Sequence, residues 1–143
     1  MLMVLISLAA AIALCIPGHA ALTLAREGRT DYRIVLCDDP IPAEETAARE
    51  LAEHLKLVTG AEFPIGGSAP GKAILVGGPA EGVDMASLKH DGIVMKTRGD
   101  ALVLTGGRPR GTLYAVYTFL EDVVGIRWWT AGERFIPQRP TLE

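Results

Sequence analysis

Short apolar runs, separated by glycine and proline breaks, recur along most of this chain of 143 residues. The run Tyr32–Cys37 contains three consecutive aliphatic residues, which predicts a strand buried on both faces. Three shorter runs predict further strands by the same reasoning: Leu22–Ala25, Glu62–Ile65 and Ala73–Val76. Two adjacent runs, Asp91–Thr97 and Asp100–Thr105, predict a hairpin whose tight turn is supplied by Arg98 and Gly99.

Two segments have the three- and four-residue apolar spacing of helices. The first begins with Pro42 at an initial helical position, extends to about Val58, and is followed by Gly60 as a left-handed cap. The second begins near Arg110 and ends at Gly125. The stretch Pro79–His90 is expected to be irregular or weakly helical, and Ile126–Trp129 extended. This order predicts a single α/β domain, a two-layer sandwich with a small mixed β-sheet and two main helices.

The first twenty residues contain no Asp, Glu, Lys or Arg. Pro17 and Gly18 interrupt this apolar run before it reaches the length of a membrane span, and small residues follow at the spacing that a signal peptidase accepts. We therefore expect residues 1–20 to be a signal peptide, cleaved near Ala20 or Ala21, and the mature protein to be secreted or periplasmic without a stable membrane span. Lipoprotein anchoring through Cys15 is disfavoured because Leu14 stands where that signal requires a small residue.

The charged residues give a formal net charge of −3 and form no long block of one sign. Nucleic-acid binding is therefore not expected, since it ordinarily needs a basic patch or stripe. After cleavage only Cys37 remains, so an internal disulfide is excluded and the fold must depend on its core.

No segment predicts a catalytic, cofactor-binding or metal-ligating site. The segment Gly66–Lys72 has the spacing of a phosphate-binding loop, but Ala73 replaces the magnesium-binding hydroxyl and a strand follows instead of a helix. The acidic pairs are adjacent in sequence and so do not face each other as glycosidase carboxylates must. His54 and His90 lack metal-ligand spacing, and His54 is expected to be partly exposed and structural.

The C-terminal third carries a more specific signal, in Gly106–Asp122 and Gly125–Trp129. These segments resemble the N-terminal module of family 67 α-glucuronidases and of related secreted bacterial proteins, a module similar in fold to the non-catalytic α/β domain that precedes the barrel of β-hexosaminidases. The resemblance covers nearly all of the mature chain and extends to three further segments: Ala47–Leu51 with Leu55, Thr59–Ala61, and Ile74–Gly77.

The resemblance implies roles for the Arg-Gly-x-x-Tyr-Ala segment, which in the family begins a helix packed on the sheet. Here Arg110 and Gly111 begin that helix, Gly111 allows close approach of backbone, and Tyr114 is expected to be an amphipathic core residue beside Ala115. Relatives often have a cysteine after the glycine that ends the helix, where this chain has Ile126.

The resemblance also implies that the catalytic carboxylates belong to a (β/α)8 barrel following the module. Such a barrel needs about 250 residues, so we expect residues 21–137 to form the accessory module and residues 138–143 to begin a linker to a catalytic domain absent from this chain. The expected partner is this downstream barrel, and a polysaccharide is a further candidate. Alternatives are a free-standing carbohydrate-binding module and a small enzyme with an unrecognised site.

Trp128 and Trp129 are adjacent in the sequence, and they fit both an accessory module and a free-standing carbohydrate-binding module. Alternation along a strand sends their rings to opposite sides, so that one can enter the core while the other meets a neighbouring domain. Sugar stacking is the other interpretation of an exposed tryptophan.

Overall fold

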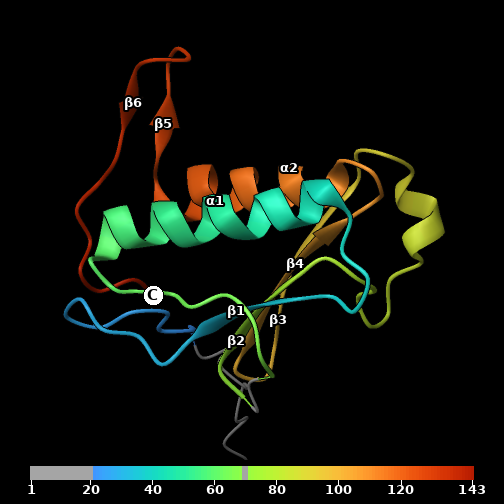
Figure 1. Cartoon of the computed structure of the whole chain (residues 1–143), viewed down its shortest axis with the longest axis horizontal. Helices are drawn as coiled ribbons and strands as arrows, with labels where there is room; N and C mark the ends of the chain where they lie inside the picture. Colours follow the sequence, from blue (N-terminus) through green and yellow to red (C-terminus); the bar gives the residue numbers. More distant parts are fainter. Residues whose placement is uncertain (1–20, 69–70) are drawn as a thin grey trace, which may run out of the picture.

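A four-stranded mixed sheet and two helices form the two layers of the molecule, as predicted (Figure 1). The computed structural model describes residues 21–68 and 71–143, so the predicted signal peptide and Cys15 lie outside the described residues. The elements along the chain are β1 (Arg33–Leu36), α1 (Pro42–Thr59), β2 (Ala73–Val76), the 3₁₀-helix η1 (Met85–Leu88), β3 (Ile93–Arg98), β4 (Ala101–Gly106), α2 (Gly111–Thr118), the π-helical turn η2 (Phe119–Val124), β5 (Arg127–Trp128) and β6 (Arg134–Phe135).

The sheet has the order β1-β2-β4-β3, with β3 antiparallel and the other three strands parallel. Both helices lie on one face of the sheet (Figure 1). Ile34, Ile74 and Leu104 are fully buried in the core beneath them. The aliphatic runs of β1 and β2 therefore form strands where the sequence predicts them, because burial rewards β-branched residues on a pleated surface.

Local sequence signals set both ends of α1. Pro42 occupies the first helical turn, and the Glu44 carboxylate accepts a hydrogen bond of 3.0 Å from the Ile41 backbone amide. Gly60 closes the helix in the left-handed conformation, with φ of 79°. The predicted apolar stripe is buried, including Leu51 and Leu55.

The second helix changes geometry along its length. The α-helical turns of α2 widen at Phe119 into η2, and Gly125 ends the element with φ of 92°. Phe119, Leu120 and Val124 are buried, so the wide turn still directs its apolar side chains into the core.

Three of the weaker predictions need correction. Leu22–Ala25 and Glu62–Ile65 form only isolated bridges, through Ala25 and Ile65, instead of strands. Arg98 pairs with Ala101, so the turn between β3 and β4 consists of Gly99 and Asp100, one residue later than predicted. Gly99 has φ of 56°, which is the positive value that a tight two-residue turn requires.

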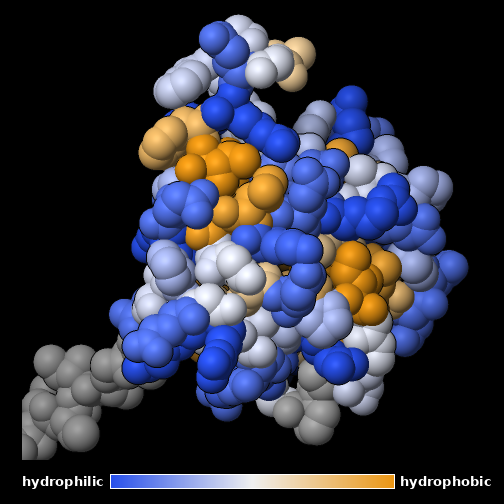
Figure 2. All heavy atoms as spheres, turned by 60° about the vertical axis from the view of Figure 1, so that its left-hand side comes forward, coloured by the Kyte–Doolittle hydropathy of each residue, from blue (hydrophilic) through white to orange (hydrophobic). Residues whose placement is uncertain are grey.

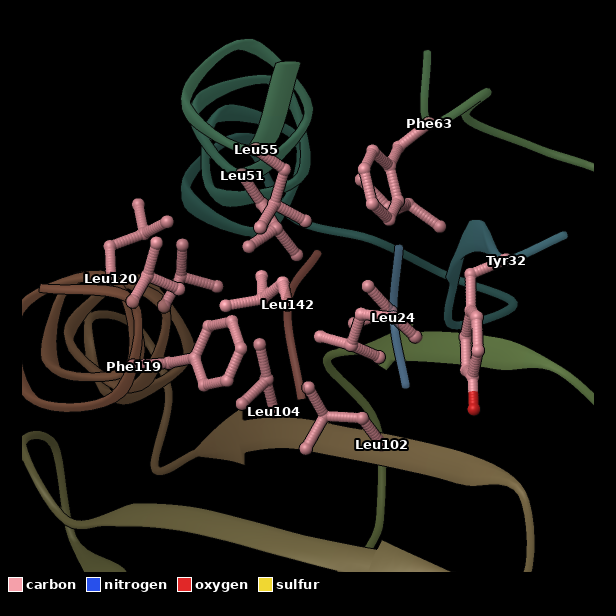
Figure 3. Close-up of a cluster of buried hydrophobic side chains, with 14 of the residues drawn as sticks. Leu24, Tyr32, Leu51, Leu55, Phe63, Leu102, Leu104, Phe119, Leu120 and Leu142 are labelled. Carbon is pink, nitrogen blue, oxygen red and sulfur yellow. The ribbon is translucent and has the colours of Figure 1, made fainter. Parts of the chain in front are cut away.

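The predicted linker, residues 138–143, is instead packed into the fold. Leu142 is 1% exposed and lies between α1, η2 and β4, near Leu51, Phe119 and Leu104 (Figure 3). Its amide donates to the carbonyl of Ala25, and its carbonyl accepts from Leu24. Residues 138–143 are therefore held to the folded domain, because Leu142 is buried in its core, the Arg139 amide donates to the Val58 carbonyl, and the Pro140 carbonyl accepts from the Gly28 amide.

Helices of the described residues are all too short or too polar to cross a membrane.

Candidate functional site

The two-stranded hairpin of β5 and β6 projects beyond the helices (Figure 1). Arg127 pairs with Phe135 and Trp128 with Arg134, and the amide of Trp129 donates to the carbonyl of Glu133 at 3.0 Å. Directly opposed residues share a face of an antiparallel pair. The hairpin therefore has an inner face with Trp128 and Arg134, and an outer face with Arg127, Phe135 and Trp129.

The inner face is anchored on the helical layer. The ring of Trp128 is partly buried and meets the rings of His54 and Tyr117 edge-on, with centroids 5.7 and 5.3 Å away. The Tyr117 hydroxyl donates to the Glu50 carboxylate at 3.0 Å. Burial and then this hydrogen bond raise the pKa of Tyr117. Both helices thus supply the aromatic and polar surface against which the hairpin packs, through Glu50 and His54 of α1 and Tyr117 of α2.

His54 lies within this contact surface and is only 1% exposed, so the prediction of a partly exposed histidine is wrong. Its Nδ1 is 2.8 Å from the backbone oxygen of Glu50, and its Nε2 is 3.2 Å from Nη1 of Arg134. The helical pattern placed His54 off the apolar stripe, on a side that would face solvent if the hairpin did not cover it. Burial here comes from a contact that helical periodicity does not encode.

The outer face of the hairpin carries two exposed aromatic rings. Trp129 is 68% exposed and Phe135 is 50% exposed. Trp129 lies opposite Glu133, which makes it a diagonal neighbour of Phe135, within reach of aromatic side chains. Trp128 and Trp129 thus point to opposite sides, as alternation predicts. In Figure 2 the hairpin projects above a mostly polar body on which hydrophobic side chains form two separate patches.

The start of α2 is held by an ion pair and a close backbone approach. Arg110 donates to Asp91 through Nε at 3.0 Å and Nη2 at 3.1 Å. A Cβ on Gly111 would overlap the carbonyl oxygen of Gly92 and would lie 2.8 Å from the carbonyl carbon of Gly106. Only glycine fits at this position, because the obstructing atoms are backbone.

Tyr114 is 41% exposed, so its predicted core position is wrong. Its ring lies 6.0 Å from the guanidinium of Arg110, within the range of a cation–π contact. The core positions of α2 are taken by Ala115 and Val116 instead, both fully buried. Small residues let α2 approach α1 and the sheet closely, and the large Tyr114 side chain is left outside.

A second polar cluster lies where the parallel strands end and both helices begin. Glu44 is 1% exposed, and its carboxylate accepts from Arg108 Nε at 3.1 Å and Nη2 at 2.9 Å. Arg108 Nη2 also donates to the Asp39 carbonyl at 2.7 Å and lies 3.7 Å from the sulfur of Cys37. The pair joins the first turn of α1 to the loop between β4 and α2.

Burial and pairing set the protonation of this cluster. Burial alone would raise the pKa of Glu44, but the hydrogen bonds from Arg108 and the Ile41 amide hold it below its usual value. Burial, followed by the nearby Glu44 charge, raises the pKa of Cys37. The thiol is therefore held protonated although Arg108 lies beside it, and a protonated thiol is a poor nucleophile.

A cavity of about 460 Å³ adjoins this cluster, bordered by Glu44, Arg108 and the glycines that follow β2 and β4. A Cβ on Gly77 would lie 3.0 Å from the Glu44 carboxylate, and one on Gly78 would lie 2.9 Å from Cys37. These two glycines thus accommodate the protein's own side chains. The hydrogen bonds within the cluster account for its buried polar groups, and its role is to join α1 to the loop between β4 and α2.

The other candidates from the sequence do not converge on a site. Lys72, from the loop that resembles a phosphate cradle, pairs with Asp31 at 2.9 Å, and β2 follows that loop directly. Among residues 21–68 and 71–143, no three His, Cys, Asp or Glu side chains lie close enough together to hold a metal ion.

Sequence reasoning missed β6 and the Glu44–Arg108 pair. The two residues of β6 show no periodicity, and Glu44 and Arg108 are 64 positions apart. The one available signal was the pair of acidic residues at the start of α1, which the helix dipole alone already explains.

No known protein family matches this chain, and no curated protein matches its sequence.

Proposed function

We propose that this chain is a non-catalytic accessory domain of a secreted glycoside hydrolase of the α-glucuronidase kind, and that the outer face of its β5–β6 hairpin packs against the catalytic barrel. The sequence resemblance suggests the class of parent enzyme. The exposed aromatic face formed by Trp129 and Phe135 supports the mode of association.

The proposal rests on the hairpin, because only one of its two faces packs against the rest of the domain. Two strands of two residues each are too small to be stable without packing. The inner face has that packing through Trp128, whereas the outer face leaves two large rings in solvent. Exposed apolar surface of this kind marks interaction sites, and aromatic residues are enriched in them.

The polar clusters support a non-catalytic role. The buried carboxylate of Glu44 is engaged by Arg108 and the Ile41 amide, and Arg110 is engaged by Asp91. A catalytic acid or base must instead reach a substrate proton. The fold alone does not decide the matter, since one fold serves many functions.

The test compares the outer face in the isolated domain and in the full-length protein encoded by the same reading frame. Hydroxyl-radical footprinting measures the labelling of each side chain, and we expect Trp129 and Phe135 to be several-fold less labelled in the full-length protein. Tyr114 is the matched control, because it is a half-exposed aromatic residue outside the hairpin. Equal labelling of Trp129 in both proteins would overturn the proposed docking.

The second candidate function is a free-standing carbohydrate-binding module, which the same exposed Trp129 favours. Aromatic faces stack on sugar rings, and Glu133 lies opposite Trp129 across the hairpin as a polar neighbour. Titrating the isolated domain with soluble oligosaccharides that carry glucuronic acid distinguishes the two. Saturable binding that Trp129→Ala abolishes would favour this candidate, and no binding would favour the accessory domain.

A further inference from the structure

Strand β3 forms one edge of the sheet. The order β1-β2-β4-β3 places β4 on one side of it and, within residues 21–68 and 71–143, no strand on the other. Its pairing with β4 continues without a bulge from Ile93 to Arg98. An edge strand of this length presents a row of unpaired backbone amides and carbonyls, which is a template for pairing with another chain.

Two hydrogen bonds show which backbone groups of β3 point away from the sheet. The Gly107 amide donates to the Gly92 carbonyl at 2.9 Å, so Gly92, one residue before β3, faces β4. The Leu104 carbonyl accepts from the Gly77 amide at 3.0 Å on the β2 side, so Met95, which pairs with Leu104, faces away from β4. Because these directions alternate along an antiparallel ladder, the outward groups belong to three residues: Ile93, Met95 and Thr97.

The side chains of the same three residues lie on the helix side of the sheet and leave apolar surface open there. Ile93 is 37% exposed and Met95 is 38% exposed. Met95 and Thr97 border a groove of about 460 Å³, whose other walls include Phe119 and Val123 of η2. A strand added beside β3 therefore gains backbone hydrogen bonds, and its alternate side chains lie along this groove.

The charged side chains of β3 leave this edge open to pairing. Lysines on edge strands commonly block the approach of another strand. Lys96 lies on the sheet face opposite Met95, because neighbouring side chains in a strand alternate. Its Nζ donates to the Glu81 carbonyl at 2.7 Å, which holds the charge against the loop between β2 and η1. Arg98 is the last residue of the strand, next to the turn.

We propose that β3 pairs antiparallel with β3 of a second copy of the chain, so that the two sheets join across a two-fold axis. The axis passes through Met95, which lies opposite the partner's Met95. Ile93 then lies opposite the partner's Thr97, and Thr97 opposite the partner's Ile93. Every outward amide and carbonyl of β3 is paired, and the partner's Ile93 extends the apolar wall of the groove beside Thr97.

Charge and strand length select this register over its neighbours. Lys96 faces the partner's Val94 and Arg98 faces the partner's Gly92, so no like charges are directly opposed. Moving the partner by two residues in one direction sets the two Lys96 side chains opposite each other. Moving it by two residues in the other direction leaves Thr97 opposite Asp91, outside β3.

The first test combines sedimentation equilibrium with residue-resolved hydrogen exchange over a series of protein concentrations. We expect the mass to rise towards that of a dimer, and the amides of Ile93, Met95 and Thr97 to exchange about tenfold more slowly when about nine-tenths of the chain is dimeric. The amides of Val94 and Lys96 face β4 and are the internal reference, slow at every concentration. A chain that stays monomeric would overturn the proposal, as would a dimer whose three outward amides exchange freely.

The second test places a charge on the two-fold axis. Met95→Lys sets two like charges opposite each other, and we expect the dissociation constant of the dimer to rise by about tenfold or more. Leu57→Lys is the matched control, because it adds the same charge at a 40% exposed apolar position of α1, and it should leave the dimer intact. An unchanged dimer in Met95→Lys, or equal weakening in Leu57→Lys, would contradict pairing through β3.

This pairing uses a different surface from the β5–β6 hairpin, so it does not rest on the proposed function. In the full-length protein we expect the same three amides to be protected only in the dimer. Their protection in a monomer would assign the β3 edge to a strand of the parent chain and would overturn the pairing of two copies. Should Met95→Lys not fold, the exchange pattern of the wild type still decides the question.

Discussion

Replacing Leu142 by alanine tests the finding that this residue belongs to the core. Leu142 is 1% exposed and lies among Leu51, Phe119 and Leu104 (Figure 3). A buried Leu→Ala change removes the transfer energy of the side chain and leaves a cavity, which together cost about 2–5 kcal/mol. Because the position is closed on all sides by α1, η2 and β4, we expect about 3 kcal/mol.

Urea unfolding of the domain, followed by circular dichroism, measures this loss. A destabilisation of about 3 kcal/mol lowers the melting temperature by about 10 °C for a domain of this size. Val123→Ala is the control, because Val123 is 47% exposed and should change stability by no more than about 0.5 kcal/mol. If Leu142→Ala cost as little as this control, residues 138–143 would be a linker after all, and the packing described here would be refuted.

Three further changes test other parts of the structure. Glu44→Gln should cost about 2 kcal/mol at neutral pH, a value reduced because Arg108 is half-exposed to solvent. Since the pKa of Glu44 is lowered by folding, its contribution is present above about pH 4 and disappears as the pH falls through the folded value, so acid titrations of the two proteins should converge. Gly111→Ala should destabilise by about 1–3 kcal/mol in thermal melts, whereas Gly132→Ala, where a Cβ meets no atom within 4 Å, should be nearly neutral. Tyr117→Phe removes the hydrogen bond to Glu50 and should cost about 1 kcal/mol, and an unchanged urea midpoint would argue against that bond.

The parts of the fold that the sequence predicted are those specified by local pattern. The runs around Val35 and Ile74 and the stripe of α1 each place apolar residues at the period of one element. Gly60 and Gly125 end their helices at positive φ, as their positions indicated. These signals lie within a few residues of one another, so they can be recognised in a single sequence.

The parts that sequence did not predict depend on contacts between distant segments. Leu142 is one apolar residue among polar ones, and its burial follows from pairing with Leu24 and Ala25. Helix α2 is apolar around most of its surface, so periodicity could not tell that Tyr114 faces out. His54 is buried only because a hairpin formed some 80 residues later covers it.

We propose that this domain supports a catalytic domain that follows it in the same protein. The most direct measurement is to sequence the DNA downstream of the codon for Glu143 and translate it in frame. We predict a reading frame that continues for several hundred residues with the alternating strands and helices of a (β/α)8 barrel. A stop codon directly after Glu143 would contradict it.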